Sequence, residues 1–357
     1  MTDYELISFC VTCYNQEKYI KESIQSVLNQ DYPNLEIIIS DDCSTDNTYG
    51  IINELLNNYK GNHKVFLLRN KTNLGISENR NIVLKKATGK WIISQDGDDI
   101  SVLNRASIIA QYIKNKSVSA IYTSTYSINQ IGKGIKKIPI NLTLGSQLVL
   151  SGSNASYSKK VIDGFMPLNS NAMDDTTLLF RSLIIGSILI LDSPTVYDRE
   201  NSDFKYYLRK RLKYLYLVLN SYNQRQNDLL NYRDKLDHKI FKFLEKHNVR
   251  HINELTNYLK SSRFESEVYL DKIYFTKNKL TQFALIYKMK ETNIIKKAKI
   301  FLLTFLPFRN LSIIIKNRNK HSKFSNKFKI ISIDDLISEK YIIDTINDFK
   351  FNDYAHN

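Results

Sequence analysis

The sequence predicts an α/β protein with a mostly parallel sheet flanked by helices, followed by a mainly helical C-terminal region. Over the first hundred residues, apolar strand-like runs alternate with amphipathic helical segments. This order is typical of parallel sheets with right-handed crossovers. Acidic clusters follow directly after two of the strand-like runs. Beyond about residue 205, strand signals fade and long segments rich in Leu, Tyr and Lys replace them.

The individual elements follow from periodicity and from the residues that cap or end them. Strands are predicted where apolar residues run together, and helices where they recur every three to four residues. Asp46 or Asn47 is expected to cap the second helix, and Gly89 to end the third. The predicted strands are 6–12, 35–39, 65–68, 91–94, 120–126 and 188–191, the last closing before Pro194. The predicted helices are 19–29, 48–58, 77–86, 175–185, 206–220 and 228–246.

Charge is divided unevenly along the chain. The formal net charge of the 357 residues is +15, and acidic and basic side chains balance within residues 1–200. The whole excess therefore falls in the C-terminal part, which indicates that the two parts do different jobs. The length allows two domains. We expect one domain over residues 1–205 and a basic, mainly helical region over residues 206–357.

Cysteine usage and the N-terminus indicate a cytoplasmic protein. Cys10 and Cys13 have a C-x-x-C spacing, but side chains three apart in a strand point to opposite faces. No second pair and no nearby His completes a zinc site, so we expect small apolar residues in a reducing compartment. The N-terminus shows no signal-peptide pattern. No apolar run reaches the roughly 18–20 residues that a spanning helix needs.

The two acidic clusters after strands indicate a binding site at one edge of the sheet. Ligands bind open α/β sheets at the carboxyl ends of the strands, and clustered carboxylates there repel each other unless a cation or hydrogen-bond donors lie between them. The Asp96–Asp99 cluster contains three carboxylates in four residues, and hard oxygen ligands suit Mg²⁺ or Mn²⁺. It therefore favours a metal site for a phosphorylated ligand over a solvated Asp-Gly turn.

A structural and a functional interpretation are both open for Asp41 and Asp42, which begin the other cluster, and for a third pair, Asp174 and Asp175. Asp41 and Asp42 could bind a ligand, but the residues that follow them fit a turn and a helix cap equally well. Asp174 and Asp175 open a predicted helix, where acidic residues commonly complement the helix dipole. The functional alternative for this pair is a general base that deprotonates a hydroxyl.

Taken in order, these motifs resemble those of inverting family 2 glycosyltransferases of the GT-A fold, which transfer sugars from nucleotide diphosphate sugars. The resemblance covers roughly residues 4–205. Each motif is short, and the ordered set is specific. The set consists of residues 11–15, 23–30, 41–48, 73–81, 91–99, Gly164-Phe165 and 174–186.

The resemblance implies a role for each matching residue. Asp175 would be the catalytic base with Asp174 beside it, and Asp98 and Asp99 would bind a divalent metal, Mn²⁺ or Mg²⁺. The implied nucleotide-sugar contacts are Thr12, Tyr14, Asn15, Asp41, Asp42, Arg80, Asp96 and Arg199. The family often has Arg-x-His after the last strand, whereas this chain has Asn201 in place of the His.

The resemblance also implies partners: a UDP-sugar donor and a glycan or lipid-linked oligosaccharide acceptor, in surface polysaccharide biosynthesis. One alternative is a sugar nucleotidyltransferase, but the glycine- and lysine-rich phosphate loop that would favour it is missing. A non-catalytic nucleotide-sugar or nucleic-acid binding protein is another.

The basic C-terminal part suggests a membrane surface. No acidic residue lies between Glu291 and Asp334, while apolar runs occupy residues 300–308 and 311–315. This composition suits an anionic membrane surface. It also fits a solvated helical domain, and nucleic acid is less favoured. We therefore expect a protein that is peripheral on the inner face of the cell membrane.

Overall fold

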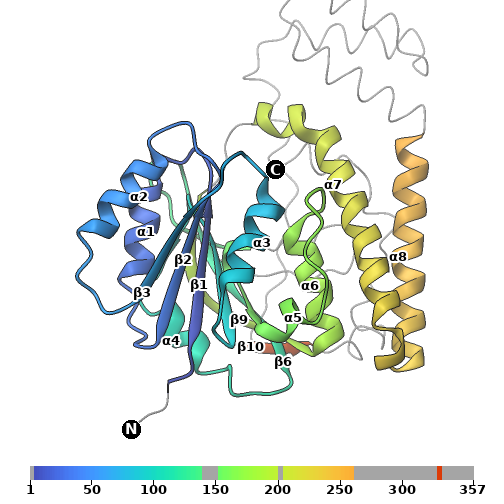
Figure 1. Cartoon of the computed structure of the whole chain (residues 1–357). Helices are drawn as coiled ribbons and strands as arrows, with labels where there is room; N and C mark the ends of the chain where they lie inside the picture. Colours follow the sequence, from blue (N-terminus) through green and yellow to red (C-terminus); the bar gives the residue numbers. More distant parts are fainter. Residues whose placement is uncertain (1–3, 139–151, 200–203, 261–327, 332–357) are drawn as a thin grey trace, which may run out of the picture.

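The computed structural model describes residues 4–138, 152–199, 204–260 and 328–331. Within them, ten strands form one mixed sheet in the order β10-β9-β6-β8-β4-β1-β2-β3, with β5 paired to β9 and β7 to β6 (Figure 1). The strands are β1 (Ile7–Cys13), β2 (Leu35–Asp41), β3 (Lys64–Arg69), β4 (Trp91–Asp96), β5 (Ile100–Ser101), β6 (Val118–Ile128), β7 (Lys136–Ile138), β8 (Ala155–Ser158), β9 (Ser187–Arg199) and β10 (Phe328–Ile331).

The N-terminal half of the sheet is parallel, as predicted. β1 pairs in parallel with both β2 and β4, and β3 continues the sheet beyond β2. The connecting helices are α1 (Ile20–Leu28), α2 (Thr48–Asn57) and α3 (Ile76–Lys86). Asn47 occupies the N-cap position of α2 without a side-chain capping bond, and Asp46 before it accepts a 3.0 Å hydrogen bond from the Thr48 amide. The alternation of apolar runs and helical periodicity was therefore sufficient to assign this half.

The other half of the sheet brings further strand ends to the same edge. β8 is antiparallel to both β4 and β6, so β6 runs in the same direction as β4. β9 is parallel to β6. The carboxyl ends of β1, β2, β4, β6 and β9 therefore share one edge, which we call the carboxyl edge.

Helices cover both faces of the sheet (Figure 1). On one face, α1, α2 and α4 (Arg105–Ala110) enclose a core that contains Cys13. On the other, α3, α5 (Lys159–Asp163) and α6 (Asp174–Ile185) enclose a core that contains Cys10. The two cysteines thus point to opposite faces, as predicted. Burial raises the pKa of Cys10 to about 12, so its thiol stays protonated.

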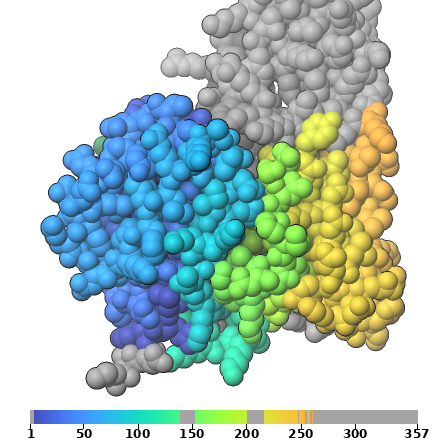
Figure 2. All heavy atoms as spheres, in the orientation of Figure 1, coloured from blue at the N-terminus to red at the C-terminus, as the bar shows by residue number. Residues whose placement is uncertain are grey.

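A helical hairpin of α7 (Phe204–Asn231) and α8 (His238–Leu259) packs outside α6. The predicted boundary at residue 205 falls at the start of α7. Figure 2 shows the α5–α6 segment, in green, between the blue N-terminal part and the yellow and orange hairpin. Arg181 on α6 and Asp228 on α7 form a buried two-bond ion pair of 2.7 and 3.2 Å. Leu229, Phe241 and Leu244 join the α6 side of the core.

Two predicted boundaries were wrong. β9 does not close before Pro194 but runs on to Arg199. The pairing of β9 with β6 shifts register around residues 192–195, and such an irregularity tolerates a residue without an N–H. The polar residues 221–227 do not break the helix, because Ser221 and Gln224 of α7 bind the segment before α6. The break lies at residues 232–237 instead.

The basic stretch between residues 291 and 334 lies outside the described residues except for β10. The predicted membrane contact of this stretch therefore stays a prediction. A second stretch, the turn-forming residues 132–145, is described only up to residue 138. Among the helices that the structure describes, none is long and apolar enough to cross a membrane.

Candidate functional site at the carboxyl edge

The carboxyl edge brings the ends of β1, β2 and β4 into register. Thr12 lies opposite Asp96 on β4, and Cys13 lies opposite Asp41 on β2. The Thr12 hydroxyl is 3.5 Å from Asp96 Oδ1. Two of the acidic clusters that the sequence singled out therefore flank the end of β1.

Arg80 on α3 connects this edge to the start of α6. Its Nη2 donates to Asp96 Oδ1 at 2.7 Å, and its Nε donates to Asp174 Oδ2 at 3.0 Å. Burial by itself would lower the pKa of Arg80, but Asp96 and Asp174 outweigh it and raise that pKa. The third nitrogen, Nη1, is buried, and none of the described residues accepts a hydrogen bond from it. A buried guanidinium is thus the cation that lies between acidic groups 78 residues apart in sequence.

Asp175 lies beside this ion-pair network. It is partly exposed, and its pKa is raised well above the ordinary value by burial and by the charges of Asp174 and Asp96, against the opposing effect of Arg80. Two buried tyrosines, Tyr122 and Tyr157, lie nearby with their hydroxyl oxygens 3.3 Å apart. The carboxyl group can therefore hold a proton more tightly than an ordinary aspartate does.

The two remaining carboxylates of the β4 cluster have different surroundings. Asp98 is partly exposed and receives a hydrogen bond from Gln16. Burial and Asp96 raise its pKa to about 6, although Arg199 opposes the shift. Asp99 is buried and accepts hydrogen bonds from the Arg199 amide at 3.0 Å and from Ser153. Asp98 is accordingly the carboxylate of this turn with room for a ligand.

Arg199 lies at the site but is held by protein groups. Its Nε donates to the Asp98 carbonyl at 2.8 Å, its Nη1 to the Gln130 carbonyl at 3.2 Å, and its Nη2 pairs with Glu22. The guanidinium also stacks 4.8 Å from the ring centre of Tyr19. These contacts anchor β9 to the Asp98 turn. The predicted nucleotide-sugar contact of Arg199 stays a prediction.

The Asp41–Asp42 cluster is held by neutral donors. Asp42 is buried and accepts from the Asn70 side chain at 2.7 Å and from the Leu74 and Gly75 amides at 2.9 and 2.8 Å. Asp41 is buried and accepts from the Ser44 amide and hydroxyl. Both carboxylates therefore organise the loops around the end of β2.

Two other predicted nucleotide contacts lie in the loop after β1. Tyr14 is 43% exposed. Asn15 adopts a left-handed backbone with φ of 52° and accepts a 2.8 Å hydrogen bond from the Thr45 amide. This bond joins the loop after β1 to the loop after β2, and it leaves the Tyr14 side chain facing solvent.

Sequence reasoning missed the short helical turn η1 (Gly152–Asn154), which contacts β4, β6 and β9. The Ser153 hydroxyl accepts a 2.8 Å hydrogen bond from the Asp96 amide. A Cβ built on Gly152 would lie 2.7 Å from Asp175 Oδ1. The segment has no periodicity and no charge. The sequence therefore indicated only that the shape of the loop around residues 151–160 affects donor and acceptor choice, without assigning a role to any residue in it.

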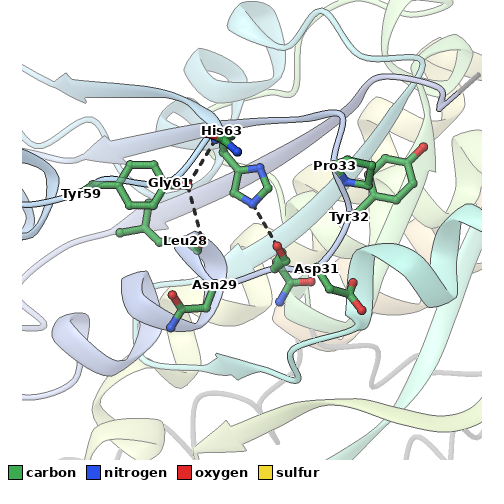
Figure 3. A pocket seen from close by; sticks show the side chains of 10 residues that line it. Leu28, Asn29, Asp31, Tyr32, Pro33, Tyr59, Gly61 and His63 are labelled. Carbon is green, nitrogen blue, oxygen red and sulfur yellow. Dashed lines mark hydrogen bonds between the residues drawn. The ribbon is translucent and has the colours of Figure 1, made fainter.

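A surface hollow of about 370 Å³ lies at the opposite edge of the sheet. It is lined by residues 28–33, Tyr59 and residues 61–63, which precede β2 and β3 (Figure 3). His63 Nε2 and the Gln30 carbonyl oxygen are 3.0 Å apart in it. None of the predicted site residues lines this hollow, so we do not assign the chemistry to it.

The donor set at the carboxyl edge fits a divalent metal bound largely through a substrate. Among the described residues, no group of three or more His, Cys, Asp and Glu side chains could hold a metal ion. Asp99 is committed to protein donors, which leaves Asp98. Mg²⁺ is commonly bound by one or two carboxylates together with substrate phosphates, so Asp98 meets that requirement. Metal binding by Asp98 and Asp99 stays a prediction.

Comparison with solved structures shows the fold. Crystal structures of S. aureus TarS residues 1–349 match with TM-scores of 0.52 and 0.51 at 19% sequence identity. The first covers 84% of this chain and 89% of TarS; the second, a complex with UDP, covers 87% and 83%. The predicted GT-A-type sheet with flanking helices is therefore confirmed.

The N-terminal half of the chain is similar in sequence to glycosyltransferases, and it spans about a third to three fifths of the length of the first relatives that it matches. A family model described as glycosyl transferase family 2 matches residues 8–181. An uncharacterized glycosyltransferase of Haemophilus influenzae is 38% identical over 122 residues, which are 34% of this chain and 37% of that protein. The Escherichia coli UDP-Glc:alpha-D-GlcNAc-diphosphoundecaprenol beta-1,3-glucosyltransferase WfaP is 31% identical over 160 residues, which are 44% of this chain and 61% of that protein. Residues 8–181 therefore match glycosyl transferase family 2, over slightly less than half of this chain.

Proposed function

We propose that the protein transfers a sugar from a UDP-sugar to a hydroxyl group of a glycan or lipid-linked acceptor, with inversion and with the help of a divalent metal. Two matching E. coli relatives are named as UDP-glucose-dependent transferases that act on a diphosphoundecaprenol-linked sugar. Their names support a role in bacterial surface polysaccharide synthesis. The inner face of the cell membrane, where such an acceptor is presented, is the proposed place of action.

The observation that carries the proposal is the joining of two acidic clusters by Arg80. Asp96 at the end of β4 and Asp174 at the start of α6 bind the same guanidinium. Asp175 follows Asp174 directly, and Asp98 follows Asp96 by two residues. A candidate base and a candidate diphosphate site thus lie on either side of one buried cation. The unpartnered Nη1 of Arg80 offers a further donor for a phosphate or sugar oxygen.

In the proposed reaction, Asp175 accepts the proton of the acceptor hydroxyl as that oxygen attacks the anomeric carbon of the donor sugar. The bond from the anomeric carbon to the acceptor oxygen forms while the bond to the diphosphate oxygen breaks, and UDP leaves. Attack from the face opposite the leaving group inverts the configuration. The raised pKa of Asp175 suits this role, because a general base works best when its pKa lies near the working pH.

The leaving diphosphate acquires negative charge that must be stabilised. A divalent metal held by Asp98 would neutralise this charge when bound. Arg80 reduces the repulsion between Asp96 and an incoming diphosphate, because its guanidinium lies 2.7 Å from Asp96 Oδ1. Gln16 and the Arg199 contacts fix the Asp98 turn in place.

The test is the variant Asp175→Asn. We expect it to lower transfer by about 10²–10⁴-fold, the usual contribution of a general base, while UDP binding measured by calorimetry with Mn²⁺ is unchanged. Asp163→Asn is the matched control, since Asp163 lies on α5, is 61% exposed and pairs only with Lys159. Transfer by Asp175→Asn at the wild-type rate would contradict the base assignment. A wild-type protein that binds no UDP and no UDP-sugar would contradict the whole proposal.

A further inference from the structure

The η1 turn contacts both sides of the proposed site through two neighbouring residues. It follows the undescribed residues 139–151 and leads into β8, which lies between β4 and β6 in the sheet. Gly152, Ser153 and Asn154 are all buried. The turn is therefore built into the interior beneath the site.

Ser153 is fixed to the acidic turn that follows β4. Its side chain is fully buried, and its hydroxyl oxygen accepts from the Asp96 amide at 2.8 Å. The same hydroxyl donates to the Asp99 carboxylate, which counteracts part of the rise in the pKa of Asp99 that burial causes. One hydroxyl thus joins the first and last residues of the Asp96–Asp99 turn.

Gly152 is fixed against the start of α6. A Cβ on this residue would lie 2.7 Å from Asp175 Oδ1 and 3.4 Å from Arg80 Nη2. Real Cβ contacts of this kind are longer, so any larger residue would push the Asp175 carboxylate away. The absence of a side chain at Gly152 is what allows the candidate base to occupy its observed position.

We propose that the η1 turn sets the separation between Asp175 and the Asp96–Asp99 turn, with Gly152 positioning the base and Ser153 positioning the donor side. This inference rests on the proposed transfer reaction and assigns it two positioning residues. A covalent Cα–C–N–Cα connection is short and stiff. Adjacent residues of one turn therefore hold the two groups at a distance that flexible side chains could not maintain.

The inference predicts a different defect for each residue: a loss of turnover for Gly152→Ala and a loss of UDP affinity for Ser153→Ala. Gly152→Ala displaces the base but leaves the Ser153 hydroxyl bonds in place. Turnover at saturating donor should therefore fall by about 10–100-fold, because a displacement of the order of 1 Å at a reacting group can cost that much, while the dissociation constant for UDP stays unchanged. Ser153→Ala loosens the Asp96–Asp99 turn. The UDP dissociation constant should rise by about tenfold, as expected for the loss of a hydrogen bond to a charged group.

Two matched controls separate positioning from general packing. Gly89→Ala introduces a Cβ 2.6 Å from the Ser8 amide nitrogen, at the other end of β4. Ser156→Ala removes a fully buried hydroxyl that has no hydrogen-bond partner. Both should alter the melting temperature without changing turnover or UDP affinity per folded molecule.

The experiment measures UDP affinity by calorimetry, donor KM and kcat, and the melting temperature for the wild type and the four variants. The inference is overturned if Gly152→Ala and Ser153→Ala lower kcat and UDP affinity in the same proportion, or if either behaves like its control. Should Gly152→Ala fail to fold, Ser153→Ala decides alone: unchanged UDP affinity contradicts the inference. A wild type that binds UDP without transferring sugar would refute the proposed function, and the inference with it. Failure of the proposed function is thus read from the wild type alone, whereas failure of the inference is read from the variants.

Discussion

The two acidic clusters at the carboxyl edge are held in different ways. The carboxylates of Asp41 and Asp42 accept hydrogen bonds mainly from neutral donors, namely backbone amides and the side chains of Ser44 and Asn70. An arginine, Arg69, approaches Asp41 to 3.4 Å but is 46% exposed. Asp96 and Asp174, by contrast, share the buried guanidinium of Arg80.

The difference separates carboxylates that accept hydrogen bonds from loop donors from carboxylates that share a buried cation. The predicted nucleotide-sugar contacts of Asp41 and Asp42 stay predictions. Asp42 uses both carboxylate oxygens to accept hydrogen bonds from the loop after β3. Around Arg80 the acidic groups outnumber the cation, and the pKa values of Asp98 and Asp175 are raised. Groups with disfavoured charge beside a cleft are the ones that gain most from a metal, a phosphate partner or a proton.

The largest expected effect is that of Arg80→Met. It leaves the carboxylate of Asp174 buried without its cation, and breaking a buried ion pair by removing one partner costs about 3–5 kcal/mol. Asp96 contributes less, because its side chain is 39% exposed and solvent screens it. The free energy of unfolding in urea measures the loss.

Arg105→Met is the control for Arg80→Met. Arg105 is equally buried, but its hydrogen-bond partners are the Ser101 hydroxyl and the Ser94 and Ala155 carbonyls. Burial lowers the pKa of Arg105 to about 9, so its charge is already disfavoured. Its removal leaves no unpaired carboxylate and should cost less. Equal losses for the two variants would contradict the special role of Arg80.

Asp42→Ala should have an intermediate effect on stability. It removes the carboxylate that accepts from the Leu74 and Gly75 amides, while the Asn70 side chain keeps its 3.1 Å hydrogen bond to Asn79 Oδ1. Hydrogen bonds to a charged group contribute about 1.5–3 kcal/mol. Urea unfolding checks this, with Asp31→Ala as the control, because Asp31 is exposed and bonds only the Ser107 hydroxyl through its side chain. A variant as stable as the wild type would show that the loop after β3 does not depend on Asp42.

The smallest expected effect is a gain in stability from Asp175→Asn at neutral pH. The folded protein raises the pKa of Asp175, so it binds this proton more tightly than the unfolded chain does. The contribution of Asp175 to stability is therefore present at low pH and is lost as pH rises from the ordinary Asp range through the raised pKa.

The free energy of unfolding of Asp175→Asn and of the wild type, measured across that pH range, should diverge in favour of the variant as pH rises. Asp163→Asn, which removes an exposed carboxylate, is the control for the loss of one formal charge. A difference between Asp175→Asn and the wild type that does not change with pH would be inconsistent with the disfavoured charge.

The sequence predicted the part of the site that lies on regular elements. Apolar runs located the strand ends, and the strand ends placed Asp96 and Asp41 at one edge, where β1 is in register with both. The expected cation or donors between the clusters after β2 and β4 stay a prediction, because Arg80 connects the β4 cluster to the start of α6 instead. The cation between Asp96 and Asp174 is Arg80, and the donors at Asp42 are loop amides.

Contacts that depend on the path of loops were not predictable. The hydrogen bonds of Asp42 to the Leu74 and Gly75 amides depend on the path of residues 70–75. Every residue except proline has a backbone amide, so the amino-acid sequence does not indicate which amides will donate. Gly152 and Ser153 lie near the acidic groups because β8, which follows them, is inserted between β4 and β6. Local periodicity does not predict this position of β8 in the sheet. Pro194 suggested that the strand ended too early. The register shift that accommodates this proline arises from the pairing of β9 with β6, so it cannot be predicted from the sequence of β9 alone.

The central claim is that Asp96 and Asp174 belong to one site through Arg80. A double-mutant cycle on the free energy of unfolding tests it without requiring a known sugar donor. Asp96→Ala and Asp174→Ala each leave Arg80 with one partner, whereas the double variant leaves it with neither, so we expect a loss that exceeds the sum of the two by about 1 kcal/mol or more. Additivity within about 0.5 kcal/mol, as found for distant independent residues, would contradict the claim.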